Sequence, residues 1–160
     1  MWFKLNYVSV KKGFIDKLKT LFPNVTFYAG DVVEGYQRPC MFTKLIIVSD
    51  TSENYNSERI NASFIITYLQ EYIDEVDMLN AIDSIKDSFR LGFTIETNNE
   101  SKFINVFDID TDLVGPQGNV LQVTIDCVWL NDIAHASSSS DNISNIRMNG
   151  SVDYQTDLED

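Results

Sequence analysis

Several residue types that carry chemistry are rare in this chain. Among its 160 residues there are two cysteines, Cys40 and Cys127, one histidine and three prolines. Two cysteines cannot build the disulfide framework that holds small secreted domains together. Residues 1–10 lack the apolar core of a signal peptide, and no apolar run approaches the roughly 20 residues that cross a bilayer. We therefore expect a soluble protein made in a cytosol, without a membrane partner and with reduced thiols.

Catalytic and ligand-binding motifs are scarce as well. Cys40 and His135 could form a nucleophile and its base, whereas an isolated cysteine is usually a small buried apolar residue. The stretch DIDTD, residues 108–112, resembles the start of a calcium loop, but Leu113 and Asn119 stand where that loop needs Gly and Glu. Its carboxylates are more typical of the solvated end of an edge strand. We expect no enzyme, metal or cofactor, and keep a Cys40-dependent enzyme or thiol sensor as an alternative class.

Acidic side chains outnumber basic ones, 24 to 12, which gives a net charge of −12. Such a chain repels a phosphate backbone, so we expect no nucleic-acid recognition. The charge is uneven: residues 1–44 carry +4, residues 45–130 carry −11 and residues 131–160 carry −5. Opposite charges on different segments allow copies of the chain to associate head to tail, although an unevenly solvated surface explains the same pattern.

Hydrophobic periodicity predicts two helices, at residues 8–22 and 75–89. The first has its apolar side chains on one face and its lysines on the other, and Asp74 can cap the second. A polar loop is predicted at 49–58 and a turn at 115–119. Strands are predicted where residues alternate or are β-branched and aromatic, at 25–29, 40–48, 59–69, 93–97, 102–109 and 120–130. The middle of the second of these strands is expected to be buried on both faces.

This order of elements predicts an α+β fold, a mixed, mainly antiparallel sheet with two helices packed on one face. Residues 1–130 form this single domain. Residues 131–160 are rich in Ser, Asn and Asp and form an acidic C-terminal arm without clear periodicity. Its apolar side chains, among them Ile143, Ile146 and Tyr154, are spaced like anchors that dock into a neighbour. We expect this arm to be mobile in the isolated subunit and ordered in an assembly.

The stretch FYAGDVVEGYQRPCMFTKL, residues 27–45, carries a resemblance to a known family. A helix that ends near "FP" and a short strand precede an acidic residue and a glycine, and a Pro-Cys-aromatic step then leads into the next strand. This pattern is similar to that of the tail terminators of long-tailed phages and phage-tail-like particles. The resemblance extends over about residues 8–130 and leaves 131–160 without a counterpart. The matching residues are Glu34, Gly35, Pro39, Cys40 and Phe42.

The resemblance implies a virion structural protein that is assembled in the host cytoplasm. Its copies would form a six-fold ring on the head-proximal end of the tail tube, where the ring stops polymerisation. It would contact the sheath if the tail is contractile, and would present a surface to the neck or head. Another neck or head-completion connector is the alternative within the same particle.

The same stretch suggests which residues form contacts between subunits. Gly35 is expected to allow a turn that a side chain would obstruct, and Pro39 to prevent pairing at an unpaired strand entrance. Cys40 would then pack inward. The candidate interface residues come from the 27–45 stretch, the basic helix at 8–22 and the arm. They are Lys11, Lys12, Lys17, Lys19, Glu34, Gly35, Arg38, Pro39, Ile143, Ile146 and Tyr154.

Overall fold

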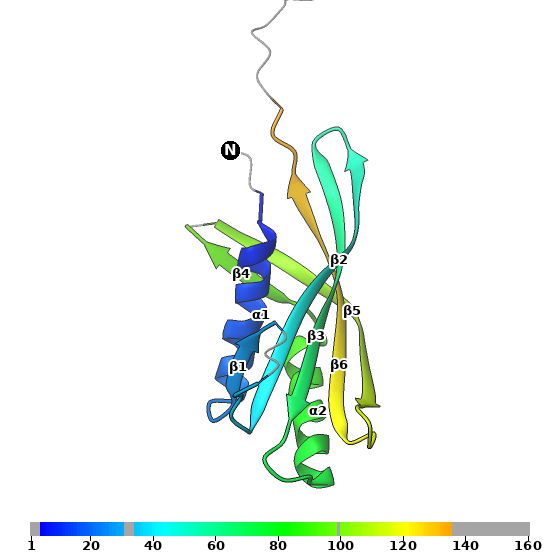
Figure 1. The fold of residues 1–160 in the computed structure, drawn as a ribbon. Coiled ribbons are helices and arrows are strands. Elements are labelled where there is room, and N and C mark those ends of the chain that lie inside the picture. The colour runs from blue at the N-terminus through cyan, green and yellow to red at the C-terminus, as the bar shows by residue number, and fades with distance from the viewer. Residues whose placement is uncertain (1–3, 31–33, 99, 136–160) are drawn as a thin grey trace, which may run out of the picture.

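The computed structural model describes residues 4–30, 34–98 and 100–135, and Figure 1 shows their arrangement. Two helices and six strands follow one another in the predicted order, and the predicted α+β class is confirmed. Neither helix in these ranges has the length and apolarity to cross a bilayer. The elements are α1 (Tyr7–Leu21), β1 (Thr26–Ala29), β2 (Cys40–Asn54), β3 (Ser57–Leu69), α2 (Glu75–Phe89), β4 (Phe93–Thr97), β5 (Glu100–Val114) and β6 (Val120–Asp132).

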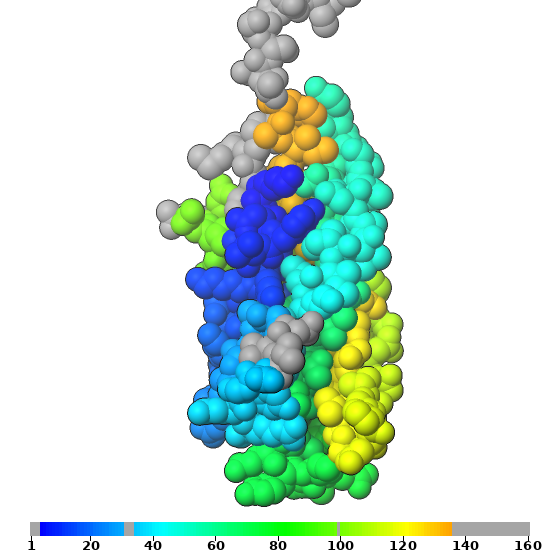
Figure 2. Space-filling model, viewed as in Figure 1, coloured from blue at the N-terminus to red at the C-terminus, as the bar shows by residue number. Residues whose placement is uncertain are grey.

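The strands form one sheet in the order β1-β2-β3-β6-β5-β4. β1 pairs with β2 in parallel, and the other neighbouring pairs are antiparallel. β2 and β3 form a long hairpin whose tip reaches one end of the elongated molecule (Figures 1 and 2). The sheet is therefore mixed and mainly antiparallel, as predicted.

Both helices cover the same face of the sheet. The ring of Phe14 in α1 stacks on Phe64 of β3, with ring centroids 4.3 Å apart. The hydroxyl of Tyr68, further along β3, donates to the Asp77 carboxylate of α2 at 2.9 Å. Residues an even number apart on a strand point to the same side, so the helices share that side. In the described part of the chain, the outer face of the sheet carries no helix.

The hydrophobic core lies between this face and the helices. The apolar seam of α2 is buried, and Asp74 caps this helix by accepting a hydrogen bond from the Val76 N–H at 2.9 Å. β6 alternates as predicted, with one buried face. β3 buries its predicted face, and its other face, which carries Ile65 and Leu69, is half-buried. Their inward residues are Ile60, Ala62, Phe64, Ile66, Tyr68, Leu121, Val123, Ile125, Cys127 and Trp129.

The predicted polar loop at 49–58 is wrong. β2 continues to Asn54 and β3 begins at Ser57, so these residues extend the hairpin beyond the core. The Arg59 guanidinium makes two hydrogen bonds to the Glu53 carboxylate, at 2.7 and 2.8 Å, across the two strands. Hydrophobic periodicity cannot reveal this extension, because its side chains are polar and backbone pairing holds it in place.

Burial of the middle of β2 on both faces is also wrong. Met41 and Thr43 point into the core, whereas Lys44, Ile46 and Val48 are exposed on the outer face. The reason is that no second layer covers the outer face in the described ranges. Apolar side chains at alternate positions of a strand therefore mark a partly exposed apolar surface here, not a second core.

β6 runs past the predicted end at 130, to Asp132. Asn131 is fully buried, accepts a hydrogen bond from the Leu5 N–H at 3.1 Å and donates to the Leu5 carbonyl at 3.3 Å. It also donates to the Glu58 carboxylate at 3.3 Å. Asn131 thus joins the two ends of the domain and is part of the core rather than of the predicted arm. The arm's candidate residues lie outside the described residues: Ile143, Ile146 and Tyr154.

Candidate assembly surfaces

The structure separates the two residues of the predicted cysteine–histidine dyad. Cys40 is buried at the start of β2, and burial raises the pKa of its thiol more than Arg38 lowers it. His135 stacks on Tyr55 at the far tip of the hairpin, with ring centroids 3.8 Å apart. The 15 residues of β2 lie between them, which at about 3.3 Å per residue is roughly 45 Å. Cys40 is therefore a packing residue, and so is Cys127, whose thiol pKa burial raises to about 12.

The outer face of the sheet brings together carboxylates that are distant in sequence. Asp108 and Asp110 of β5 and Asp126 of β6 have carboxylate oxygens within 4.8 Å of one another. Asp108 lies opposite Asp126 in the strand ladder, and the Ser63 hydroxyl donates to Asp126. β5 continues beyond 108–112, so this stretch lies along the strand and not at its end. Beyond the proximity of the carboxylates, nothing in the described residues indicates a bound ion at this group. Its physical effect is like-charge repulsion on the outer face.

Asp108→Asn is expected to stabilise the fold by roughly 0.5 kcal/mol, because like charges directly opposite each other destabilise a sheet. An asparagine can still accept the hydrogen bond that the Ile109 N–H gives to this side chain. Chemical denaturation at neutral pH and low salt measures the gain, which should shrink at high salt as the charges are screened. A loss of stability instead would show that the Asp108 charge makes a favourable contact.

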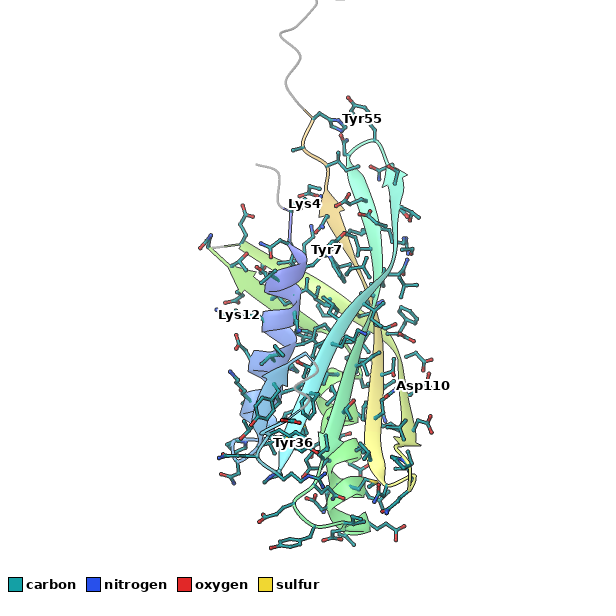
Figure 3. The ribbon with its side chains drawn as sticks, in the orientation of Figure 1. Lys4, Tyr7, Lys12, Tyr36, Tyr55 and Asp110 are labelled. Carbon is teal, nitrogen blue, oxygen red and sulfur yellow. The ribbon has the colours of Figure 1, made fainter. Side chains whose placement is uncertain are left out.

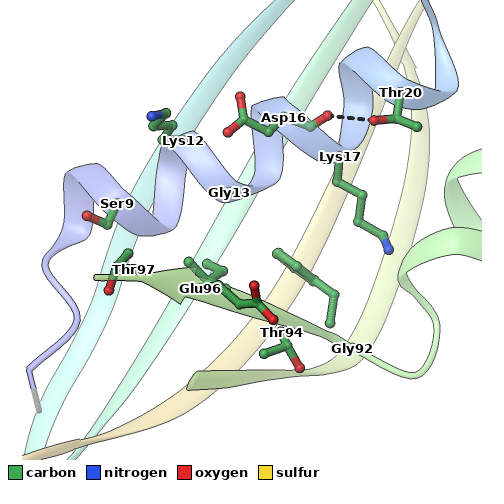
Figure 4. A pocket seen from close by; sticks show the side chains of 12 residues that line it. Ser9, Lys12, Gly13, Asp16, Lys17, Thr20, Gly92, Thr94, Glu96 and Thr97 are labelled. Atoms are coloured by element: carbon green, nitrogen blue, oxygen red, sulfur yellow. Dashed lines mark hydrogen bonds between the residues drawn. The ribbon is translucent and has the colours of Figure 1, made fainter. Parts of the chain in front are cut away.

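A groove of about 640 Å³ runs between α1 and β4 (Figure 4). Gly13 of α1 faces it, and a Cβ there would lie 2.7 Å from Cδ1 of Ile95, so the glycine permits the close approach of helix and strand. Lys17 also lies on this flank, with its ammonium 5.6 Å from the ring centroids of both Phe89 and Phe93. Lys17 is thus engaged in cation–π contacts within its own subunit, and its predicted place on the face opposite the core is wrong.

The remaining lysines of α1 point in other directions. The flank of α1 that carries Gly13 and Lys17 faces β4, so the opposite flank, which carries Lys11, faces β2. Lys12 and Lys19 lie between these flanks and are exposed, and Figure 3 shows Lys12 directed away from the sheet. Of the four lysines, Lys12 and Lys19 are thus exposed, whereas Lys11 and Lys17 are half-buried.

The glycine and proline of the 34–39 loop act differently from their predicted roles. Gly35 has a φ of 82°, and apart from its chain neighbours no atom of the described residues lies within 4 Å of the place its Cβ would take. The left-handed backbone, and not crowding, therefore calls for glycine. Pro39 follows a cis peptide bond, and its carbonyl accepts a hydrogen bond from the Thr26 N–H at 3.1 Å. β1 therefore covers the entrance of β2, so the role of Pro39 at an unpaired entrance is wrong.

Arg38 connects this loop to the segment that follows β3. Its Nη1 donates to the Gln70 carbonyl at 3.5 Å, and its guanidinium lies over the Tyr36 ring, 5.6 Å from the centroid. Glu34 is exposed on the same loop. The structure thus brings the predicted loop residues beside the segment between β3 and α2, which sequence reasoning did not propose as a site.

Two stretches of sheet edge have no partner strand among the described residues. β1 pairs with β2 only over Cys40–Thr43, so residues 44–54 are unpaired on the side away from β3. β4 pairs with β5 only over residues 100–104, so residues 105–114 are unpaired on the side away from β6. We call these the β2 edge and the β5 edge. Exposed apolar side chains accompany them: Ile46 and Val48 on the first, Phe107 and Leu113 on the second.

The two edges differ in their charged side chains. On the β2 side, Lys11 and Lys44 are basic, while the acids Asp50 and Glu53 are hydrogen-bonded within the chain. The β5 edge carries three exposed aspartates: Asp108, Asp110 and Asp112. Figure 3 shows Asp110 on the side of the molecule away from α1. The charge asymmetry therefore leaves the β2 side of the domain more basic than the β5 side, although Lys86 and Arg90 line a hollow beside Phe107 and Asp108 of the β5 edge. We call these the basic side and the acidic side.

Comparison with known proteins identifies the family. A family described as Phage tail terminator protein matches residues 9–139, which is most of the chain and extends past 130. Among solved structures, a chain titled "Virion of native gene transfer agent (GTA) particle" is similar, with 11% identity, a TM-score of 0.48, and coverage of 72% of this chain and 84% of that one. No curated protein sequence matches significantly. The chain therefore belongs to the phage tail terminator family and is a structural component of a virion tail, not an enzyme.

Proposed function

We propose that this protein forms a ring, of six copies as the resemblance implies, that caps the head-proximal end of a phage tail tube. The ring ends growth of the tube, and of the sheath where the tail is contractile, and offers a surface to the neck or head. The family match over residues 9–139 carries the proposal. The β2 edge and the β5 edge, which have no partner strand among the described residues, support its ring form.

A ring requires two different and complementary surfaces on every copy. Strand direction alternates through β2, β3, β6 and β5. A neighbour's β2 edge placed beside the β5 edge therefore continues the antiparallel pattern. Each edge would supply the backbone hydrogen-bond partners that the other lacks, and the contact would cover the apolar side chains that accompany both. It would also bring the basic side of one copy against the acidic side of the next.

Replacing Lys11, Lys12 and Lys19 together by Glu is expected to weaken the ring roughly tenfold or more at low salt. Each reversal replaces an attraction toward the neighbour's acidic side by a repulsion, and exposed pairs are worth about 0.2–1 kcal/mol each. Lys17 is left unchanged because it contacts Phe89 and Phe93 of its own subunit. Native mass spectrometry with and without tail tubes measures the ring population.

Replacement of the same three lysines by Arg is the matched control, since it keeps the charge and should keep the ring. An unchanged ring in the Glu variant would contradict the charged contact. A strict monomer of the natural protein, alone and on tubes, would contradict the ring itself. Deletion of the gene separates capping from the alternative: over-long tubes support a terminator, whereas tails of normal length that fail to join heads indicate a neck or head-completion connector.

A further inference from the structure

The groove between α1 and β4 follows the edge of a strand. β4 is the last strand of the sheet, so among the described residues no strand pairs with its side away from β5. Every residue from 92 to 97 lines the groove. Successive side chains of a strand point to opposite faces, so a groove lined by all of them runs along the edge and not along one face. We call this side of residues 93–97 the β4 edge. Its backbone N–H and C=O groups can pair with another strand.

The other wall of the groove is one stripe of α1. Its lining residues lie three or four positions apart along one side of the helix: Ser9, Lys12, Gly13, Asp16, Lys17 and Thr20. Helix and strand run in opposite directions, with Ser9 near Thr97 at one end and Thr20 near Gly92 at the other (Figure 4). A slot between a helix and the edge of a strand is a shape in which an extended segment adds to a sheet.

The C-terminal arm contains a segment with the pattern of such a strand. The arm as a whole has no clear periodicity, but in VDYQTDL, residues 152–158, apolar or β-branched side chains alternate with polar ones. Alternation over this length is typical of a strand with one buried face. Residues 152–158 lie outside the described ranges. The sequence thus supplies an amphipathic strand beyond those of the described sheet.

The chain leaves the sheet close to one end of the groove. Asn131 of β6 is hydrogen-bonded to Leu5, just before α1 begins. Lys102, which pairs with Ile95 of β4, has its Nζ 3.9 Å from Oδ1 of Asp132. The end of β6 therefore lies near the end of the groove that Ser9 and Thr97 form. Residues 136–151 can span up to about 50 Å, so residues 152–158 can reach the groove of their own copy.

The helix and the segment have opposite charges. α1 carries four lysines and one acid, whereas residues 151–160 carry four acids and no base. The groove itself is mixed, because Lys12 and Lys17 share its walls with Asp16 and Glu96. The charge of α1 as a whole would thus attract the acidic segment at low salt, while backbone pairing would fix its position.

We propose that residues 152–158 add to the β4 edge as a further strand, in the groove of their own copy. The segment enters at the Thr97 end and runs antiparallel to β4. One of its faces lies against α1 and the border of the core at Phe93 and Ile95, and the other faces solvent. Its attachment gives it a high effective concentration at the groove, so the strand forms in the isolated subunit. This differs from the expectation that the arm is ordered only in an assembly.

The test is amide hydrogen exchange of the full-length protein, at a concentration where native mass spectrometry shows a monomer. Tyr154→Pro removes a backbone N–H and a side chain from the middle of the segment. In this variant residues 152–158 and the groove-facing amides of β4 are expected to exchange roughly tenfold faster or more than in the natural protein. Ser138→Pro places a proline in the connecting residues and should leave both stretches unchanged.

A second pair of variants tests the groove from the side of α1. Lys12 is exposed and lines the groove, so Lys12→Glu is expected to speed exchange of residues 152–158 severalfold at low salt. Lys12→Arg keeps the charge and is the matched control. Thermal denaturation verifies that the domain folds in every variant.

The outcomes decide between this groove and other places for the segment. Fast exchange of residues 152–158 in the natural monomer overturns the inference, and protection that arises only in the ring assigns the segment to a neighbouring copy instead. Protected residues 152–158 with no change at β4 in the Tyr154→Pro variant would place the segment elsewhere on the domain. Matching loss of protection in both stretches supports the inference. None of these measurements involves tail tubes, so this inference and the capping function stand or fall separately.

Discussion

Phe14→Ala is expected to lower the free energy of unfolding by about 3–5 kcal/mol, the range for removing a buried aromatic ring. Phe14 is fully buried, and its ring stacks on Phe64 at 4.3 Å and on Phe89 at 5.6 Å between centroids. It also meets the ring of Phe93 edge to face at 4.7 Å. One side chain thus joins α1 to β3, α2 and β4. The surrounding rings cannot collapse fully into the cavity that the alanine would leave. Urea or guanidinium unfolding of the purified protein measures the loss.

Val8→Ala on the same helix is the control, because Val8 is exposed and the change should stay within about 0.5 kcal/mol. Since small domains are stable by about 5–15 kcal/mol, the Phe14 variant should be close to unfolding at moderate temperature. A loss below about 1 kcal/mol would mean that the ring cluster is not the centre of the core.

Asn131→Asp is expected to cost about 3–5 kcal/mol, the range for leaving an uncompensated charge buried. The asparagine amide now donates to the Leu5 carbonyl and to the Glu58 carboxylate. An aspartate would instead place an acceptor oxygen, with a negative charge, against the Leu5 carbonyl and the Glu58 carboxylate. The Leu5 N–H could still bond to the remaining oxygen, but it cannot offset the repulsion. Thermal and chemical denaturation measure the effect.

Asn80→Asp adds the same charge at an exposed position of α2 and should change stability by less than about 0.5 kcal/mol. Hydrogen exchange provides a second measurement. In the Asn131 variant the Leu5 amide and the end of β6 should lose protection before the centre of β3 does. Equal stability of the two variants would show that Asn131 does not join the ends of the domain.

Strong periodicity made most elements predictable from the sequence. α2 begins and ends where its apolar seam and its Asp74 cap predict, at Glu75 and Phe89. The alternation in β3 and β6 correctly predicted their buried faces, because a strand with one buried face must repeat every two residues. The separation of Cys40 from His135 could not be read from the sequence, because residues far apart in the chain can still meet, as Leu5 and Asn131 do.

The candidate surfaces were less predictable because exposure depends on neighbours. Lys17 has the spacing of a surface residue, yet the rings of Phe89 and Phe93 lie beneath its ammonium. Tyr72 and Ile73 are large and apolar, as core residues are, yet both are exposed in the segment between β3 and α2. Neither outcome has a signal in local periodicity.

The sequence by itself determined the element order, the inward faces of the central strands and the charge asymmetry, because each depends on residues close together in the chain. Only the tertiary structure decided the strand order, and with it which edges of β2 and β5 lack a partner strand in the part of the chain that is described. It also brought Leu5 against Asn131 and Asp108 against Asp126. Pairing between distant segments depends on how the whole chain closes its backbone hydrogen bonds around one core, and no local pattern of side chains contains that information.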